Sequence, residues 1–227
     1  MSGQRTAAWR AARLGKATAS RIADIIARTR NGYAASRSNY AAQLVCECLT
    51  GLAPETFVSP AMHWGLGQEA SARQFYAFEH DADVTPAGFL DHPTIAFSGA
   101  TPDGFVGDEG LIEIKCPNTA SHIETLLGGA PPAKYLAQMQ WQMAVTGRLW
   151  CDFVSFDPRL PFELQLFVQR IRRDDRVIAA LEEEVASFLD EVARTVAALD
   201  ALGRPGPQRQ TAGPGDAAND DDRTAAA

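Results

Sequence analysis

Residues 101–115 read Thr-Pro-Asp-Gly-Phe-Val-Gly-Asp-Glu-Gly-Leu-Ile-Glu-Ile-Lys, and the rest of the chain is organised around them. Asp103 lies in a turn-like Pro-Asp-Gly, and ten residues later Glu113 and Lys115 stand two apart on an apolar run that predicts a strand. Successive side chains of a strand point to opposite faces, so Glu113 and Lys115 share one face and the neighbouring isoleucines share the other. One face can therefore carry chemistry while the other packs into a core.

These three charged residues fit the hydrolysis of a phosphodiester. The reaction needs a deprotonated water and stabilisation of negative charge on the phosphoryl and leaving oxygens, which two Mg²⁺ ions about 4 Å apart can supply. Because Mg²⁺ prefers oxygen ligands, Asp103, Glu113 and the carbonyl of Ile114 are the candidate metal ligands. Lys115 can orient the attacking water and hold charge on the phosphate. The pattern predicts a metal-dependent nuclease, with an exposed hairpin that carries scattered charges as the alternative.

Two predicted helices supply further side chains to this site. The helix expected over 59–79 has proline at a favoured first position and carries Glu69, which could complete a second metal site or bind its waters. The helix expected over 133–146 places Gln138 and Gln142 on one face, because residues four apart in a helix are neighbours. Polar groups on such an apolar helix favour a role in the site, with capping of neighbouring loops as the alternative.

The charge of the chain is unevenly distributed. The net charge is −7, but residues 1–40 carry eight Lys and Arg side chains against one Asp. A basic segment beside an acidic metal site suits a polyanionic substrate, whose phosphates need cations at one place and metal at another. On charge alone, a solvated basic helix surface is the alternative.

The basic segment begins with a candidate phosphate site. Residues 6–14 predict a short helix that carries Arg13, and Thr18 and Ser20 then offer N-caps for a second helix. A helix N-terminus presents free N–H groups, so Ser20 with Arg13 nearby could hold a terminal phosphate, although a helix cap alone would also explain Ser20. Residues 29–37 lack periodicity and predict a mobile basic loop that could touch DNA.

The remaining pattern predicts an α/β domain with a central mixed sheet flanked by helices. The other expected elements are strands within 82–116 and over 150–156 and 162–171, and helices over 38–51, 120–127 and 174–202. We expect a single domain over 1–203. The Gly/Pro/Ala/Asp-rich residues 204–227 predict a disordered tail.

Composition is that of an ordinary globular protein. The chain is 46% hydrophobic, yet no apolar run approaches the roughly 20 residues that a membrane span requires. The N-terminus lacks a signal-peptide pattern, so we expect a cytoplasmic protein whose four cysteines stay reduced. Cys46 and Cys48 would point about 200° apart on their helix, which favours core packing over shared metal binding.

Several motifs agree in order and spacing with one known family. They are Arg13-Leu14-Gly15, Thr18-Ala19-Ser20, Trp64-Gly65 with Glu69, Thr101-Pro102-Asp103-Gly104, Glu113-Ile114-Lys115-Cys116-Pro117 and Tyr135-Leu136-Ala137-Gln138-Met139-Gln140. From about residue 9 to 199 the chain resembles the phage lambda exonuclease or YqaJ-type viral recombinase family. These are restriction-endonuclease-like, PD-(D/E)XK nucleases, so the resemblance implies that core fold.

The resemblance also implies an activity and partners. It implies a Mg²⁺-dependent exonuclease of a phage or prophage recombination module, with two ions and with Mn²⁺ able to substitute. Such an enzyme digests one strand of duplex DNA from its end in the 5′→3′ direction and leaves a 3′ single strand for a phage-type annealing protein. A ring-shaped homotrimer around the DNA, in the cytoplasm of a bacterial host and with no membrane partner, is implied as well.

The resemblance assigns roles residue by residue. Asp103, Glu113 and Lys115 fall on the metal and water positions, with Glu69 and Gln138 on supporting positions. The 5′-phosphate pocket corresponds to Arg13, Ser20 and Thr101, and Met62 corresponds to an apolar side chain that wedges the duplex end apart. A further family aspartate has no counterpart, since Asp91 is displaced by about two residues.

Three other readings stay open on sequence. A RecB-like nuclease with an iron–sulfur cluster would need four converging cysteines, and Cys116 is expected to point away from the catalytic face. A site-specific endonuclease would cut closed circular DNA, which an enzyme that needs an end cannot do. A catalytically silent DNA-end-binding module would have no need of Lys115 beside Glu113.

Overall fold

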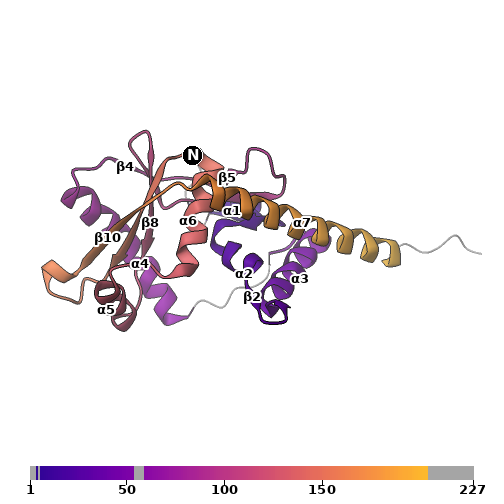
Figure 1. Cartoon of the computed structure of the whole chain (residues 1–227), viewed down its shortest axis with the longest axis horizontal. Helices are drawn as coiled ribbons and strands as arrows, with labels where there is room; N and C mark the ends of the chain where they lie inside the picture. Colours follow the sequence, from indigo (N-terminus) through magenta and orange to yellow (C-terminus); the bar gives the residue numbers. More distant parts are fainter. Residues whose placement is uncertain (1–3, 5, 54–58, 204–227) are drawn as a thin grey trace, which may run out of the picture.

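A five-stranded sheet forms the centre of the computed structural model (Figure 1). Its strand order is β10-β9-β8-β7-β4, with β4 at Val84–Thr85, β7 at Gly104–Val106, β8 at Gly110–Lys115, β9 at Trp150–Phe156 and β10 at Leu166–Arg172. β8 and β9 are parallel and the other neighbours are antiparallel, so the predicted mixed sheet is confirmed. The structure describes residues 4, 6–53 and 59–203, and the predicted tail lies outside them.

Helices cover both faces of this sheet, as the sequence pattern predicts. On one face α4 (Pro60–Glu79) packs Ala72 and Tyr76 against Ile112 and Ile114 of β8. On the other face lie α5 (Thr119–Gly128) and α6 (Ala133–Thr146), and the methionines of α6 pack against Leu111 of β8. Because helices cover both faces, residues 110–114 of β8 are buried, including Glu113 on the α6 side.

A second unit packs against the far side of α6. Its short sheet has the order β1-β6-β5, with β1 at Ala17–Thr18, β6 at Ser98–Ala100 and β5 at Leu90–Asp91. Around it lie α1 (Ala7–Arg13), the 3₁₀ turn η1 (Ala19–Arg21), α2 (Ile22–Ile26), α3 (Ala35–Thr50) and α7 (Asp175–Gly203). The apolar faces of η1, α2, α3 and α7 form one core with Trp141 of α6, and α7 extends beyond the rest of this unit in Figure 1. Residues 101–104 connect this unit to the central sheet.

The basic segment over 29–37 differs from its prediction. Instead of a loop it forms the hairpin β2 (Arg28–Thr29) and β3 (Gly32–Tyr33), and α3 begins at Ala35 rather than Ser38. Arg37 is 3% exposed, donates to the carbonyl of Ile25 and pairs with Glu191 of α7 at 2.6 Å. A pairing partner 154 residues away cannot be read from local periodicity. Arg37 therefore holds two helices together and is not available to DNA.

The expected core packing of Cys46 and Cys48 is wrong. Both side chains are exposed on α3, because Leu44 and Val45 provide its core contacts. Met62, in the first half of α4, is 53% exposed. Within the described residues, no helix has the length and apolar character needed to cross a membrane.

Candidate active site

Asp103 is fixed against β8 through the backbone. It lies in the turn between β6 and β7, where its N–H donates to the carbonyl of Ile112 at 3.2 Å. Its Oδ2 accepts a hydrogen bond of 2.7 Å from the N–H of Ile114. The Pro-Asp-Gly turn thereby carries a carboxylate to the end of the strand on which Glu113 and Lys115 lie. The structure brings together the three charged residues that the sequence predicted as the site.

Glu113 is buried and held at both oxygens. Gln138 donates to Oε1 and Gln142 donates to Oε2, each at 2.6 Å, and Lys115 forms an ion pair with Oε1. Glu113 is 1% exposed, so its charge depends on these donors. The sequence placed Gln142 on the same helix face as Gln138 but gave a specific supporting position to Gln138 alone, and the structure shows both amides bound to Glu113.

Lys115 remains an ammonium in this environment. Burial lowers the pKa of Lys115, but the charges of Glu113 and Asp103 outweigh burial and raise the pKa above its ordinary value. The ammonium also lies 4.9 Å from the ring centroid of Tyr135, within the range of a cation–π contact. Lys115 can therefore donate hydrogen bonds and stabilise negative charge, but it cannot act as a base near neutral pH.

The surroundings of Asp103 disfavour the charged form of its carboxyl group. Burial, and next the charge of Glu113, raise the pKa of Asp103 to about 8, and the charge of Glu69 adds to the effect. Lys115 acts in the opposite direction, yet the net shift is upward. Two carboxylates share one nearby ammonium, which is the electrostatic condition that an added cation relieves.

The oxygen ligands here suit Mg²⁺ in its usual binding mode. Among residues 4, 6–53 and 59–203, no three His, Cys, Asp or Glu side chains form a metal-binding group. The available ligands are the carboxylates of Asp103 and Glu113 and the carbonyl of Ile114. Mg²⁺ is commonly held by one or two carboxylates together with waters and substrate phosphates, and soft ligands are not needed. The donor set therefore fits Mg²⁺ completed by substrate.

A cavity of about 630 Å³ opens beside these residues. Its walls come from α4, the end of β8, α5 and α6, and they include Glu69, Lys115 and Tyr135. Gly65 allows α4 to approach closely, because a Cβ there would lie 2.8 Å from the carbonyl oxygen of Cys116. Met62 also lines the cavity and is exposed on its α4 side. The cavity is thus open to a substrate next to Lys115.

A second group of side chains surrounds Arg13. Its Nη1 donates to Thr101 Oγ1 and its Nη2 donates to Thr18 Oγ1, both at 3.4 Å, while Trp9 Nε1 donates to Thr101 at 3.1 Å. The guanidinium lies 4.2 Å from the Trp9 ring centroid. Burial lowers the pKa of Arg13, and the charges of Tyr40 and Glu47 oppose that shift, so the side chain stays protonated.

Ser20 lies at the rim of this group. It is the middle residue of the 3₁₀ turn η1 and is exposed, and its hydroxyl oxygen lies 3.5 Å from that of Thr18. Thr18 is buried and contacts both Arg13 and Ser20, so it is a member that the sequence did not assign. A guanidinium that contacts two hydroxyls, with a third hydroxyl next to one of them, is the kind of group that binds a phosphate.

These two groups are linked by the chain itself. Thr101, which contacts Arg13, stands two residues before Asp103, so their Cα atoms are at most about 7 Å apart. Asp91 takes no part in either group, because it pairs with Lys16 at 2.5 Å on the exposed edge of β5. Its omission from the catalytic set agrees with this position.

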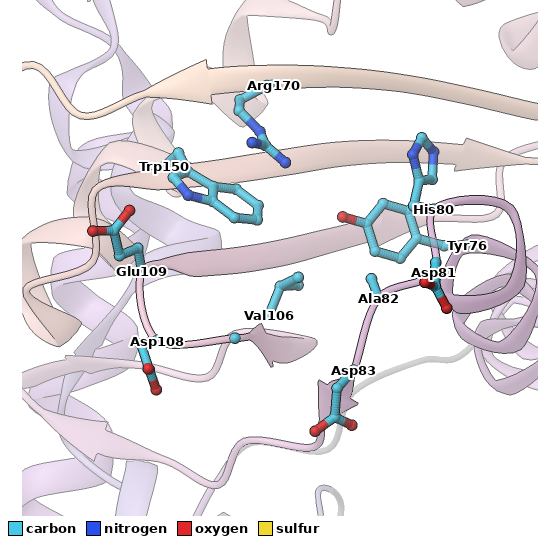
Figure 2. Close-up of a pocket in the computed structure, with 11 residues that line it drawn as sticks. Tyr76, His80, Asp81, Ala82, Asp83, Val106, Asp108, Glu109, Trp150 and Arg170 are labelled. Atoms are coloured by element: carbon cyan, nitrogen blue, oxygen red, sulfur yellow. The ribbon is translucent and has the colours of Figure 1, made fainter.

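Another cavity, of about 470 Å³, lies at the opposite end of β8 (Figure 2). Four carboxylates line it, those of Asp81, Asp83, Asp108 and Glu109. Its arginine, Arg170, stacks on Trp150 at 3.5 Å and donates to Asp152 at 2.8 and 2.9 Å. Carboxylates repel phosphate and the one guanidinium on this wall is already paired, so this cavity does not suit a DNA backbone.

Sequence comparison places the chain in a family. The model of the YqaJ-like viral recombinase domain matches residues 8–149, which is more than half of the chain. The chain belongs to the YqaJ-like viral recombinase family. The matched range of this YqaJ-family chain contains every residue assigned above to the two groups. No curated protein matches it in sequence.

Solved structures share the fold of this YqaJ-family chain. An alkaline exonuclease from Laribacter hongkongensis is 53% identical, with a TM-score of 0.82 over 87% of this chain and 97% of that one. The same enzyme in complex with dAMP gives the same values. A phage related exonuclease from Haemophilus somnus 129PT is 16% identical, has a TM-score of 0.67 over 81% of this chain and 96% of that one, and supports the fold alone.

Proposed function

We propose that the chain is a Mg²⁺-dependent DNA exonuclease. It digests one strand of duplex DNA from its end in the 5′→3′ direction and leaves a 3′ single strand for recombination by annealing. The observation that carries this proposal is the convergence of Asp103, Glu113 and Lys115 beside an open cavity, two residues along the chain from the Arg13 pocket. The 53% identical alkaline exonuclease supports the same class of reaction.

Each residue near the cavity has a role in this proposal. Asp103, Glu113 and the Ile114 carbonyl hold Mg²⁺, which supplies activation of the attacking water and neutralisation of the leaving oxygen. Lys115 orients that water and stabilises charge on the phosphoryl oxygens, since its raised pKa keeps it protonated. Gln138 orients the carboxylate of Glu113 by donating a hydrogen bond to Oε1.

Glu69 is the proposed support for a second ion. It lines the cavity and adds negative charge near Asp103, which suits a site for that ion or its waters.

The pocket around Arg13 is the proposed site for the end of the substrate. Arg13, Ser20 and Thr101 bind the 5′-phosphate. Their position supports cutting measured from a phosphorylated 5′ end, because Thr101, which contacts Arg13, stands two residues before Asp103.

Met62 is the proposed wedge at the duplex end. Met62 lines the cavity and is 53% exposed, so its apolar side chain is accessible to a duplex end there. We further propose a homotrimer ring, a phage-type annealing protein as partner, Mn²⁺ as a substitute for Mg²⁺, and a cytoplasmic location in a bacterial host, all from the family resemblance. A single domain over 1–203 belongs to the same proposal.

One experiment tests the reaction and its direction. Linear duplex DNA carrying a label on one strand is incubated with the protein and Mg²⁺, with EDTA in a parallel sample. We expect the strand with the 5′-phosphorylated end to shorten from that end in Mg²⁺ and to stay intact in EDTA. Shortening from the 3′ end would overturn the polarity, and equal digestion in EDTA would overturn the metal requirement.

The same assay separates the alternatives. Closed circular duplex DNA should stay intact, because the proposed enzyme needs an end; cutting of the circle would indicate an endonuclease. Binding of ends without any digestion in Mg²⁺ would indicate a silent end-binding module. An iron–sulfur enzyme would be coloured when purified, and Cys46 and Cys48 diverge on α3 instead of converging.

A further inference from the structure

Ser155 places a hydroxyl beside Lys115 that the proposed reaction does not yet use. Ser155 on β9 is the register partner of Lys115 on β8, and neighbouring strands lie about 4.8 Å apart. Side chains that are register partners face the same side of a sheet, and both line the 630 Å³ cavity. Ser155 is 1% exposed, so its hydroxyl lies in the buried floor of that cavity.

His122 fixes the direction in which this hydroxyl donates. It lies on α5, is completely buried, and its Nε2 is 2.9 Å from the carbonyl oxygen of Leu164. A carbonyl can only accept, so Nε2 carries the proton, and in the neutral imidazole Nδ1 is then an acceptor. Nδ1 lies 2.7 Å from Ser155 Oγ, so the hydroxyl of Ser155 donates a hydrogen bond to Nδ1 of the neutral ring. The lone pairs of Ser155 remain for a donor in the cavity.

Lys115 is the donor that needs such an acceptor. Its ammonium now binds Glu113 Oε1, which also accepts from Gln138. A divalent cation on the Glu113 carboxylate would repel the ammonium from the same group. The centroid of the Tyr135 ring lies 4.9 Å from the ammonium, and the face of the ring attracts the cation but has no lone pair that could accept a hydrogen bond. A fixed oxygen on the adjacent strand would keep Lys115 in the site.

We propose that Ser155 is a positioning residue for Lys115. When Glu113 binds a divalent cation, the oxygen of Ser155, oriented by His122, accepts a hydrogen bond from the displaced ammonium. Lys115 then stays directed into the cavity instead of moving away from the charge. This inference rests on the proposed function, because it gives Lys115 its place during the reaction.

The test compares Ser155→Ala with the wild-type chain in two measurements. Rates on 5′-phosphorylated duplex should show kcat lower by roughly tenfold or more with KM unchanged, because a hydrogen bond to a charged group is lost. Calorimetric titration with Mg²⁺ in the absence of DNA should show weaker binding, because the displaced ammonium has lost its acceptor. If Ser155 acts in folding alone, Ser155→Ala would lower the melting temperature, but kcat and Mg²⁺ affinity measured below that temperature would equal those of the wild type.

Three variants provide the controls. Ser98→Ala removes an equally buried strand hydroxyl, which donates to the carbonyl of Ile95 at 2.8 Å, and should leave both measurements unchanged. His122→Gln should retain most activity, since an amide can donate to Leu164 and accept from Ser155. Ser155→Thr should rescue kcat relative to Ser155→Ala, because it keeps the hydroxyl. If Ser155→Ala does not fold, Ser155→Cys, which replaces the oxygen by a weak acceptor, takes its place under the same criteria.

The outcomes separate this inference from the proposed function. Digestion by Ser155→Ala at the wild-type kcat, with wild-type Mg²⁺ affinity, overturns the role of Ser155 and leaves the exonuclease proposal intact. A wild-type chain that digests no DNA refutes the exonuclease proposal, and the Mg²⁺ titration then decides the inference alone. If the wild type digests no DNA and binds Mg²⁺ with the same affinity as Ser155→Ala, the proposed role of Ser155 is overturned as well.

Discussion

Gln142 donates a hydrogen bond of 2.6 Å to the Oε2 atom of Glu113, a carboxylate that is 1% exposed. Gln142→Leu should therefore lower the free energy of unfolding by about 1.5–3 kcal/mol, the usual worth of a hydrogen bond to a charged group. It should also slow digestion, because Glu113 loses the donor that orients it. Gln140→Leu is the matched control. Gln140 lies on the same helix as Gln142, but it binds the backbone carbonyl of Arg172 and the N–H of Asp174 instead of Glu113. Chemical denaturation and strand digestion below the melting temperature should show stability loss in both variants but slower digestion in Gln142→Leu alone.

Lys115 and Asp103 should each be required for the reaction. Lys115→Ala removes the ammonium beside Glu113, and Asp103→Asn removes a carboxylate fixed by Ile114. Each should lower kcat at least about a hundredfold, the usual effect of removing one preorganised charge-stabilising group. Circular dichroism checks that both variants are folded, and a folded variant with wild-type digestion would remove that residue from the site.

Asp103 should make the metal-free protein less stable at alkaline pH. Its pKa is raised to about 8, whereas an aspartate in an unfolded chain has a pKa of about 3.9. The folded state thus binds a proton that the unfolded state has lost, so stability falls as pH rises from about 4 to about 8 and is then constant. Asp103→Asn removes this loss, and its melting temperature should exceed that of the wild type above pH 8 without metal.

Addition of Mg²⁺ provides the control for that prediction. It should raise the melting temperature of the wild-type chain, because the bound cation balances the charges of Asp103 and Glu113. For a protein of this size about 1 kcal/mol corresponds to roughly 2–4 °C. A similar Mg²⁺ shift in Asp103→Asn would mean that the cation binds elsewhere.

Arg13 should act on the terminal phosphate. Arg13→Ala removes the guanidinium that contacts Thr101 and Thr18, so digestion should slow most on ends that carry a 5′-phosphate. Rates on matched 5′-phosphate and 5′-hydroxyl duplexes measure the effect. Arg10→Ala, an exposed arginine on the same helix, should slow both substrates equally little. Equal slowing of both ends by Arg13→Ala would exclude it from the phosphate pocket.

Gly65 should be needed for the approach of α4 to the site. In Gly65→Ala the new Cβ would meet the backbone carbonyl of Cys116 at 2.8 Å, so the helix must shift away from the end of β8. Glu69 lies one turn further along α4 and would move with it, so digestion should slow. Gly67→Ala is the matched control, because nothing lies within 4 Å of a Cβ there. Equal rates in the two variants would show that the position of α4 does not matter to the reaction.

Local pattern predicted the catalytic strand and its helix, because the residues that carry chemistry also obey the periods of two and 3.6. The strand β8, the helix α6 and the sharing of a face by Glu113 and Lys115 all agree with the structure. Pairings distant in sequence were not accessible in this way. Arg37 pairs with Glu191 across α3 and α7, and Thr18 meets Arg13 through a turn. The proposed roles of Ser20 and Met62 are contacts with the DNA end, and sequence periodicity does not encode contacts with substrate.

The amide side chains that hold Glu113 have a consequence for the range of conditions in which the site keeps its shape. Gln138 and Gln142 carry no ionisable group, so their two hydrogen bonds persist where a histidine or a second carboxylate would change charge. The carboxylate is thus supported by donors that are insensitive to acid and alkali. Alkaline conditions therefore remove the proton from Asp103 but leave the hydrogen bonds of Gln138 and Gln142 to Glu113 in place.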